Sequence, residues 1–334
     1  MATTFQSFLI IQTAFIGDVI LATALIEKLR KFYPHASIDF LLRKGNETLL
    51  EGNPNIRKVI IWDKKKGKIK NLFKLTAYVR SKKYDCVVNA HRFASSGLIT
   101  VFSRSKIQTG FDKNPWSFLF THRIKHDLKL NLHETDRNQK LIEFITDSDR
   151  ALPKLYPSPM DFEKMSEFQT SRYICVAPTS VWFTKQFPVS QWIDFLYSIN
   201  DEVDFIYLLG GPGDRAVCED IRTNSNHYKV ANLSGQLSFL ESAALMKGAW
   251  MNFVNDSAPM HLASAMNAPV TAVFCSTVPS LGFGPLSEYS NIIETTEKLE
   301  CRPCGLHGYK KCPQGHFKCA TTISVESLQN CLTK

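Results

Sequence analysis

The chain has 334 residues, of which 44% are hydrophobic and 21% charged, and this composition excludes a disordered or fibrous protein. The length is sufficient for two domains of ordinary size. The net charge of +9 excludes a strongly acidic protein and leaves an anionic partner open.

The first part of the chain alternates short apolar strands with helices. Its longest apolar run, 8–26, is interrupted by Gln12 and Asp18, which argues against a membrane-spanning helix. No Lys or Arg precedes this run, which argues against a secretory signal, so we expect a cytoplasmic protein. The expected elements, in chain order, are strand 8–12, helix 18–32, strand 37–41, strand 59–62, a basic helix and strand 85–89.

Much of the positive charge is concentrated before and within that basic helix. One interpretation is a solvated helix face; the other is attraction to an anionic surface, either nucleic acid or an acidic membrane. The membrane is compatible because Phe73, Leu75 and Tyr78 alternate with the basic residues. The basic residues are Lys64, Lys65, Lys66, Lys68, Lys70, Lys74, Arg80, Lys82 and Lys83.

A segment with three prolines and little periodicity, 152–167, is expected to be a linker, after which the alternation restarts. Strands that alternate with helices predict an α/β protein with two parallel sheets, each covered by helices. Two such units would form a cleft, where ligands bind outside the carboxyl ends of the strands. The later expected elements are strand 173–177, helix 189–200, strand 204–209, helix 239–248, strand 250–254, a helix from Pro259 and strand 270–274.

The stretch 253–265 reads as the end of a buried strand, a polar turn and a helix that begins directly from the turn. A helix start leaves about four backbone N–H groups unpaired and carries a partial positive charge, so it suits a phosphate. Asp256 or Ser257 can cap this helix, Pro259 fits its first turn, and His261 lies within reach of the anion.

Three further strand-to-helix turns carry polar residues. Gly17 permits a tight turn after the first strand, and Asp18 either stabilises the helix dipole or acts as a general base. In the loop 178–188, Thr179 and Ser180 offer hydroxyl groups and Lys185 offers a charge for a phosphate, although a lone lysine in a loop is usually solvated. The turn 210–214 fails the dinucleotide-binding spacing, but its glycines permit close approach of a nucleotide.

Four cysteines lie near the end of the chain. Cys301 and Cys304 form a C-x-x-C pair, but Cys312 and Cys319 are too far apart in sequence to make the usual second pair. A structural zinc site is one interpretation; reduced thiols or a surface disulfide is the other. The remaining cysteines are scattered, as expected of core thiols in a reducing compartment: Cys86, Cys175, Cys218, Cys275 and Cys331.

Taken together, these motifs resemble glycosyltransferase family 9, the ADP-heptose:lipopolysaccharide heptosyltransferases. The Gly17-Asp18-Val19 turn is similar to the family's G-D-V/I motif, and 184–188 is similar to its K-x-W-P segment. The segment 255–261 is similar to the N-D-[ST]-G-x-M-H signature, and 133–138 to another family segment. The cysteine-rich tail also resembles that of many members.

The resemblance implies a GT-B fold, with two Rossmann-like domains that face a cleft. It implies an acceptor-binding domain over 1–155, a nucleotide-sugar-binding domain over 170–320, and a final helix, 321–334, that packs back on the first domain. The implied reaction is an inverting, metal-independent transfer of L-glycero-D-manno-heptose from ADP-heptose to the lipopolysaccharide inner core.

The resemblance also implies roles for individual residues. Asp18 is the general base, and Lys185 with the N–H groups of Ser257 to Met260 stabilises the departing ADP. Asp256 contacts the donor sugar, and His261 lies near the diphosphate. The implied donor-binding set is Thr179, Ser180, Asp214, Asp256, Ser257, Ala258, Pro259, Met260 and His261. The basic strip, which is the set of basic residues between Lys64 and Lys83, suits a phosphorylated glycan at an anionic inner membrane. No nucleic-acid partner is expected.

Two residues depart from the family pattern. Ala258 stands where Gly is usual, and it would be strained by roughly 1 kcal/mol or more if the turn required a positive φ. Phe187 replaces the usual Trp, a mild change. The alternatives are transfer of another nucleotide-activated sugar to a cell-surface glycan, or a non-catalytic nucleotide-sugar-binding relative.

Overall fold

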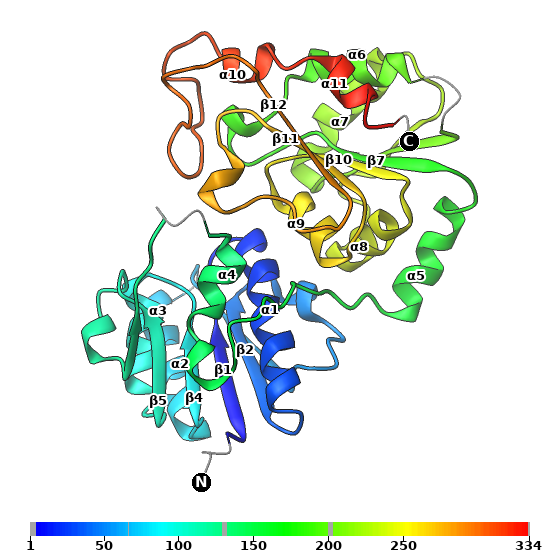
Figure 1. The fold of residues 1–334 in the computed structure, drawn as a ribbon. Coiled ribbons are helices and arrows are strands. Elements are labelled where there is room, and N and C mark those ends of the chain that lie inside the picture. The colour runs from blue at the N-terminus through cyan, green and yellow to red at the C-terminus, as the bar shows by residue number, and fades with distance from the viewer. Residues whose placement is uncertain (1–4, 66, 129–131, 200–202, 333–334) are drawn as a thin grey trace. The chain divides into compact units, whose positions relative to one another are not determined.

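The computed structural model describes residues 5–65, 67–128, 132–199 and 203–332, and the chain divides into two compact units, Met1–Tyr156 and Pro157–Lys334 (Figure 1). Lys66 of the basic strip therefore lies outside the described residues, as does the side chain of Lys68. Among the described residues, no helix combines the length and the apolar character needed to cross a bilayer.

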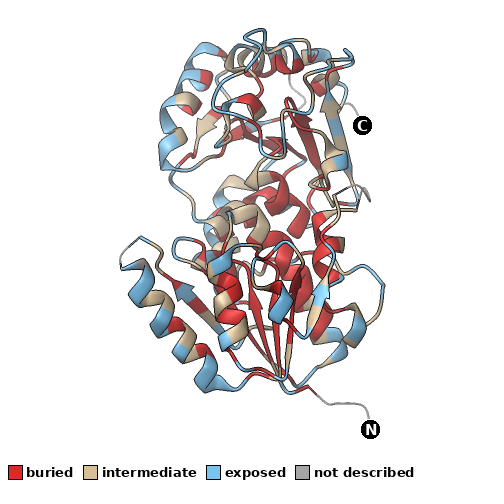
Figure 2. Ribbon diagram, turned by 90° about the vertical axis from the view of Figure 1, so that its left-hand side faces the viewer, coloured by how far each residue is buried: buried red, intermediate tan, exposed pale blue. Residues whose placement is uncertain are grey.

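The first unit is built on a six-stranded parallel sheet in the order β3-β2-β1-β4-β5-β6. Its central strands are buried on both faces, which is typical of a parallel sheet covered by helices (Figure 2). The strands are β1 (Ser7–Ile11), β2 (Ser37–Arg43), β3 (Lys58–Trp62), β4 (Cys86–Asn89), β5 (Ile107–Phe111) and β6 (His122–Ile124). The helices are α1 (Ile16–Phe32), α2 (Lys68–Lys82), α3 (Ala94–Phe102) and α4 (Glu134–Gln139), with 3₁₀ turns at Glu47–Leu50, Ser117–Leu119 and Glu143–Ile145.

The second unit repeats this plan in the order β12-β11-β10-β7-β8-β9, again entirely parallel. The strands are β7 (Tyr173–Ala177), β8 (Phe205–Leu208), β9 (Val230–Asn232), β10 (Met251–Asn255), β11 (Val270–Phe274) and β12 (Ser290–Glu294). The helices are α5 (Pro159–Met165), α6 (Val189–Ser198), α7 (Arg215–Asn224), α8 (Phe239–Gly248), α9 (Ala258–Ala265), α10 (Lys318–Thr321) and α11 (Val325–Gln329). The 3₁₀ turns are Ser166–Phe168, Phe183–Lys185, Pro212–Asp214 and Pro279–Leu281.

Each sheet has one point at which its strand order reverses. In the first unit this point lies between β1 and β4, and in the second it lies between β7 and β10. The connections that leave two such neighbouring strands diverge, and this opens a crevice at their carboxyl ends. The fold thus places the turn before α1 at one crevice, and the loops after β7 and β10 at the other.

The expected linker 152–167 contains the boundary between the two units, and its second half forms the helix α5. Ser158 caps α5 by accepting a hydrogen bond from the N–H of Asp161 at 3.2 Å, and the Asp161 carboxylate accepts one from the N–H of Ser158 at 2.6 Å. Pro159 occupies the first turn, where its missing N–H costs nothing. The capping box was therefore the signal in the sequence that outweighed the prolines.

The final helix differs from the expectation for 321–334, which placed it on the first domain. Leu328 and Leu332 belong instead to the apolar core of the second unit, with Trp192 and Phe195 of α6. The side chain of Gln191 in α6 also donates to the carbonyl of Ile323 at 2.7 Å. The described part of this segment therefore completes the second unit, because its leucines bury apolar surface there.

Candidate functional site

Asp18 lies in the first turn of α1, at the crevice of the first unit. Its carboxylate accepts a hydrogen bond from the N–H of Phe15 at 3.2 Å, so it does help to cap the helix. Burial, followed by the negative charge of Glu134, raises the pKa of Asp18 to about 6. Such a carboxylate is ionised at neutral pH but accepts a proton more readily than a solvated one, which suits a general base.

Glu134 is a buried residue whose negative charge acts on Asp18. It lies 2.8 Å from the guanidinium of Arg137 and 3.8 Å from Nε2 of His126. Burial opposes its ionisation, but contact with His126 and Arg137 outweighs burial and holds the pKa of Glu134 below its ordinary value. A charged Glu134 therefore acts on Asp18 through the low-dielectric interior. Sequence analysis missed this residue, since it read 133–138 only as a motif and a helix start.

The turn before α1 is held by two residues that follow strands, His91 after β4 and Lys64 after β3. The hydroxyl of Thr13 lies 3.1 Å from Nδ1 of His91, and Nζ of Lys64 donates to the carbonyl of Thr13 at 2.9 Å. Burial, followed by the charge of Lys64, lowers the pKa of His91 to about 3. His91 is therefore neutral at ordinary pH. Lys64, which sequence analysis assigned to the basic strip, is tied to the turn.

In the second unit, Lys185 and Asp256 come together from the loops after β7 and β10. Nζ of Lys185 lies 2.7 Å from Oδ2 of Asp256, and the side chains are only 14% and 6% exposed. The hydroxyl of Thr277, after β11, donates to the same oxygen of Asp256 at 2.6 Å. Lys185 is thus held in one place rather than solvated. Thr277 was not identified from the sequence.

Asn255 and Phe187 join the same two loops behind this ion pair. The side-chain carbonyl of Asn255 accepts a hydrogen bond from the N–H of Phe187 at 2.9 Å. The Phe187 ring is buried and packs edge-on against Trp192 at 5.1 Å between centroids. Phe187 therefore fills the core of the second unit with its ring.

The start of α9 lies next to Asp256. Ser257 is the N-cap residue with φ −154°, and Ala258 is the first helical residue. Ala258 has no positive φ, so the strain considered for a Gly-to-Ala change does not arise. Pro259 has no N–H, and the N–H of Met260 donates to the carbonyl of Ser257 at 3.1 Å. The N–H groups of Ser257 and Ala258 have no acceptor within the described ranges, so these two remain for an anion.

Most of the other residues expected to bind the donor lie around the start of α9. Asp214 is the exception, because it follows β8. The hydroxyl of Ser257 lies 3.5 Å from the carbonyl of Thr179, and the carbonyl of Ser180 accepts from Gln186 at 2.6 Å. Met260 and His261 are buried in the first turn of α9. Asp214 follows β8, and its carboxylate accepts from the N–H of Gly211 at 2.7 Å, which closes that turn.

The four cysteines near the end of the chain do not form a metal site. Among the described residues, no group of three or more His, Cys, Asp or Glu side chains is arranged to hold a metal ion. Cys304 donates to the carbonyl of Cys301 at 3.2 Å, and burial raises the pKa of Cys319 to about 11. All four are free thiols, which agrees with the reduced-thiol interpretation and not with the zinc site: Cys301, Cys304, Cys312 and Cys319.

The cysteine-rich segment 299–317 packs instead on the Lys185 loop. Thr184, next to Lys185, donates its N–H to the carbonyl of Tyr309 at 3.1 Å, and its hydroxyl accepts from the N–H of Tyr309 at 2.7 Å. Gly308 has φ +75°, and a Cβ there would lie 2.8 Å from Oγ1 of Thr184 and 3.0 Å from Cγ of Lys185. A glycine is therefore required for this close approach.

Comparison with known proteins identifies the family. The model of glycosyltransferase family 9 (heptosyltransferase) matches residues 72–309, which is more than half of the chain. The chain belongs to this family. This glycosyltransferase is 29% identical to a lipopolysaccharide heptosyltransferase 3 of Escherichia coli, with 79% of the chain and 82% of the relative covered. It is 22% identical to the lipopolysaccharide core heptosyltransferase OpsX of Haemophilus influenzae, with 88% and 85% covered.

Solved structures show that the fold of this glycosyltransferase is GT-B. The chain superposes on a family 9 glycosyltransferase from Veillonella parvula with a TM-score of 0.84 at 22% identity, covering 99% of this chain and 98% of that one. It superposes on the ADP-heptose lps heptosyltransferase II of E. coli with a TM-score of 0.78 at 20% identity, covering 98% of each chain. The sequence-based predictions of fold class, family and glycosyltransferase activity are therefore confirmed.

Proposed function

We propose that this glycosyltransferase moves L-glycero-D-manno-heptose from ADP-heptose to the inner core of lipopolysaccharide, with inversion at the anomeric carbon. The observation that carries the proposal is Lys185, held by Asp256 beside the free N–H groups of α9. That arrangement suits the diphosphate of a nucleotide sugar. The relatives named above, which are lipopolysaccharide heptosyltransferases, support this choice of sugar and acceptor.

The second unit supplies the leaving-group half of the reaction. Lysine has three N–H donors, and the bond to Asp256 occupies only one of them, so Lys185 can still donate to a phosphate oxygen. The N–H groups of Ser257 and Ala258 and the helix dipole add to this stabilisation. As the bond between the anomeric carbon and ADP breaks, these donors stabilise the charge that develops on the diphosphate.

The first unit supplies the base. A hydroxyl oxygen of the acceptor attacks the anomeric carbon from the face opposite ADP, and its proton passes to the carboxylate of Asp18. The raised pKa of Asp18 favours that proton transfer at neutral pH. One bond forms and one breaks at the same carbon, so the configuration inverts.

Transfer assays with a matched control test the assignment of Asp18. We expect Asp18→Asn to abolish heptosyl transfer while ADP still raises the melting temperature as in the wild type. Asp161→Asn is the control, because Asp161 also accepts a bond from the N–H of an N-cap residue. If UDP- or GDP-sugars raise the melting temperature of the wild type while ADP and ADP-heptose do not, another nucleotide-activated sugar is the donor. If a nucleotide sugar binds but is transferred to no acceptor, the protein is a non-catalytic relative.

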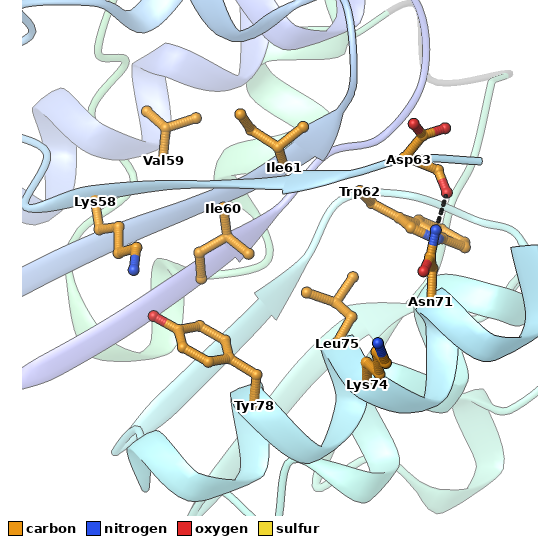
Figure 3. Close-up of a pocket in the computed structure, with 10 residues that line it drawn as sticks. All are labelled: Lys58, Val59, Ile60, Ile61, Trp62, Asp63, Asn71, Lys74, Leu75 and Tyr78. Atoms are coloured by element: carbon orange, nitrogen blue, oxygen red, sulfur yellow. Dashed lines mark hydrogen bonds between the residues drawn. The ribbon is translucent and has the colours of Figure 1, made fainter. Parts of the chain in front are cut away.

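Helix α2 supports a peripheral contact with an anionic membrane as part of this function. Ile69 and Phe73 are each 71% exposed, and Lys70 and Lys74 lie on the same helix. Leu75 and Tyr78 of α2 point toward the edge strand β3 (Figure 3). Residues of α2 and β3, Lys74 among them, line a groove of about 450 Å³. Exposed apolar side chains among lysines fit the boundary between acidic headgroups and acyl chains.

A further inference from the structure

Arg302, in the cysteine-rich segment, is a cation largely shielded from solvent that has no role in the scheme above. Its side chain is only 10% exposed, and it forms an ion pair with Glu294 of β12 at 2.7 Å. A guanidinium that leaves water must recover its hydrogen bonds from the protein around it. The acceptors of those bonds therefore identify the part of the fold that Arg302 holds.

These acceptors are backbone carbonyls of the segment 274–277, which begins at the end of β11. Nε of Arg302 donates to the carbonyl of Cys275 at 2.7 Å. One terminal nitrogen donates to the carbonyls of Phe274 at 3.0 Å and Thr277 at 2.8 Å. The planar fork of one arginine thus fixes three carbonyls within four residues.

The middle of the same segment is bonded on two sides. The N–H of Ser276 donates to the carbonyl of Thr184 at 3.2 Å, and the Ser276 hydroxyl donates to that of Thr184 at 3.0 Å. The carbonyl of Ser276 accepts a hydrogen bond from the N–H of Cys304 at 2.8 Å. The segment is therefore held between the Lys185 loop and the cysteine-rich segment.

Thr277 connects this segment to the ion pair. Its hydroxyl donates at 2.6 Å to Oδ2 of Asp256, the oxygen that lies 2.7 Å from Nζ of Lys185. Thr277 and Asp256 are 1% and 4% exposed, so water competes little for this bond. The hydroxyl reaches Asp256 only while the backbone of Thr277 stays in place, and the bond from Arg302 to the Thr277 carbonyl keeps it there.

We propose that Arg302 is a positioning residue for the proposed diphosphate site. It fixes Thr277, and the hydroxyl of Thr277 orients Asp256. Asp256 in turn places the ammonium group of Lys185. The inference deepens the proposed function and rests on it, because Lys185 is the cation assigned there to the departing nucleoside diphosphate. Lysine should not replace Arg302, because an ammonium group is a point charge without the planar fork that reaches several carbonyls.

A double-mutant cycle of Arg302→Lys and Thr277→Val tests this series of contacts, with the Kd for ADP, UDP and GDP measured by isothermal titration calorimetry on the full-length protein. We expect Arg302→Lys to raise the Kd of the nucleotide that binds about tenfold when Thr277 is present. The increase should be less than about twofold when Thr277→Val has already broken the connection. A merely structural role would lower the melting temperature but change the Kd by the same factor, or not at all, in both backgrounds. That result would overturn the proposal.

Arg222→Lys is the matched control, because Arg222 of the same unit also pairs with a carboxylate, that of Glu219, but lies on α7. It should leave the Kd unchanged. If Arg302→Lys does not fold, Glu294→Gln takes its place in the cycle, because Glu294 holds the guanidinium from β12. Its effect on the Kd should likewise depend on Thr277, and equal effects in both backgrounds would contradict the proposal.

The choice of nucleotide separates this inference from the proposed function. If the wild type binds UDP or GDP and not ADP, the proposed donor is wrong, and the cycle with that nucleotide still decides the role of Arg302. If ADP binds but the effects of Arg302→Lys and Thr277→Val are independent, only the role of Arg302 is lost. If the wild type binds none of the three, the diphosphate site is refuted, and both proposals with it.

Discussion

At the scale of single residues, the pH dependence of kcat/KM tests whether Asp18 is the base, and Glu134 is the residue to change. Because Asp18 must be ionised to accept a proton, and its pKa is raised to about 6, kcat/KM should fall about tenfold per pH unit below 6. Glu134→Gln removes a negative charge that raises the pKa of Asp18, so the acid limb should move to lower pH. A pH profile of kcat/KM for both proteins checks this. A limb that stays in place would mean that the limb belongs to another group.

A second test at this scale is whether substitution of Lys185 weakens the binding of ADP. Lys185→Gln removes a charge-assisted bond to the diphosphate, which is worth about 1.5–3 kcal/mol, so the Kd for ADP should rise roughly 10- to 150-fold. Isothermal titration calorimetry measures the change. Lys311→Gln serves as the control, because Lys311 is an exposed residue of the cysteine-rich segment. Unchanged ADP binding in Lys185→Gln would remove Lys185 from the donor site.

At the scale of elements, the cysteine-rich segment acts as a support for the Lys185 loop. Gly308→Ala places a Cβ 2.8 Å from Thr184 and 3.0 Å from Lys185, so ADP binding should weaken several-fold together with stability. Gly315→Ala is a matched control, because Gly315 has the same φ of +75° but no neighbour within 4 Å. The control should show only backbone strain, of about 1–2 kcal/mol in the free energy of unfolding. Equal ADP affinity in both variants would contradict the supporting role.

Helix α2 offers a second test at the scale of elements. Phe73→Ser and Lys74→Gln should each reduce co-sedimentation with vesicles rich in acidic lipid. The first removes apolar area that would enter the membrane, and the second removes an attraction to the acidic surface of about 1 kcal/mol. Phe118→Ser is the control, since Phe118 is 67% exposed but belongs to another element, the 3₁₀ turn Ser117–Leu119. Binding to neutral vesicles at the same level as to acidic ones would argue against an electrostatic contact.

At the scale of the whole molecule, all the groups expected to bind ADP belong to one of the two units. Hydrogen exchange with and without ADP should therefore show the largest protection in 178–188 and 255–261, within Pro157–Lys334. The turn before α1 should be protected mainly when the acceptor is present. Strong protection of that turn by ADP alone would contradict the division of roles between the units.

Some strands were not predicted from the sequence of this molecule, and they share a feature that explains why. These strands are β5, β6, β9 and β12. The last three lie at the edges of their sheets, and neither β6 nor β12 has a fully buried residue. β5 lies inside its sheet, but its sequence includes Gln108, Thr109 and Gly110. Such strands lack the continuous apolar run that marks β1 or β7. Their existence depends on pairing with a neighbour, which local composition does not encode.

The sequence by itself determined the alternation of strands and helices, the turns that carry Asp18, Lys185 and Asp256, and the family, because these are local patterns. Only the tertiary structure decided which of these residues meet. The strand order brings the loops after β7 and β10 together, so Lys185 pairs with Asp256. The same principle gathers Glu134, Arg92 and Asp18 in the first unit. Electrostatic effects depend on distance through space, and the fold, not the spacing along the chain, sets that distance.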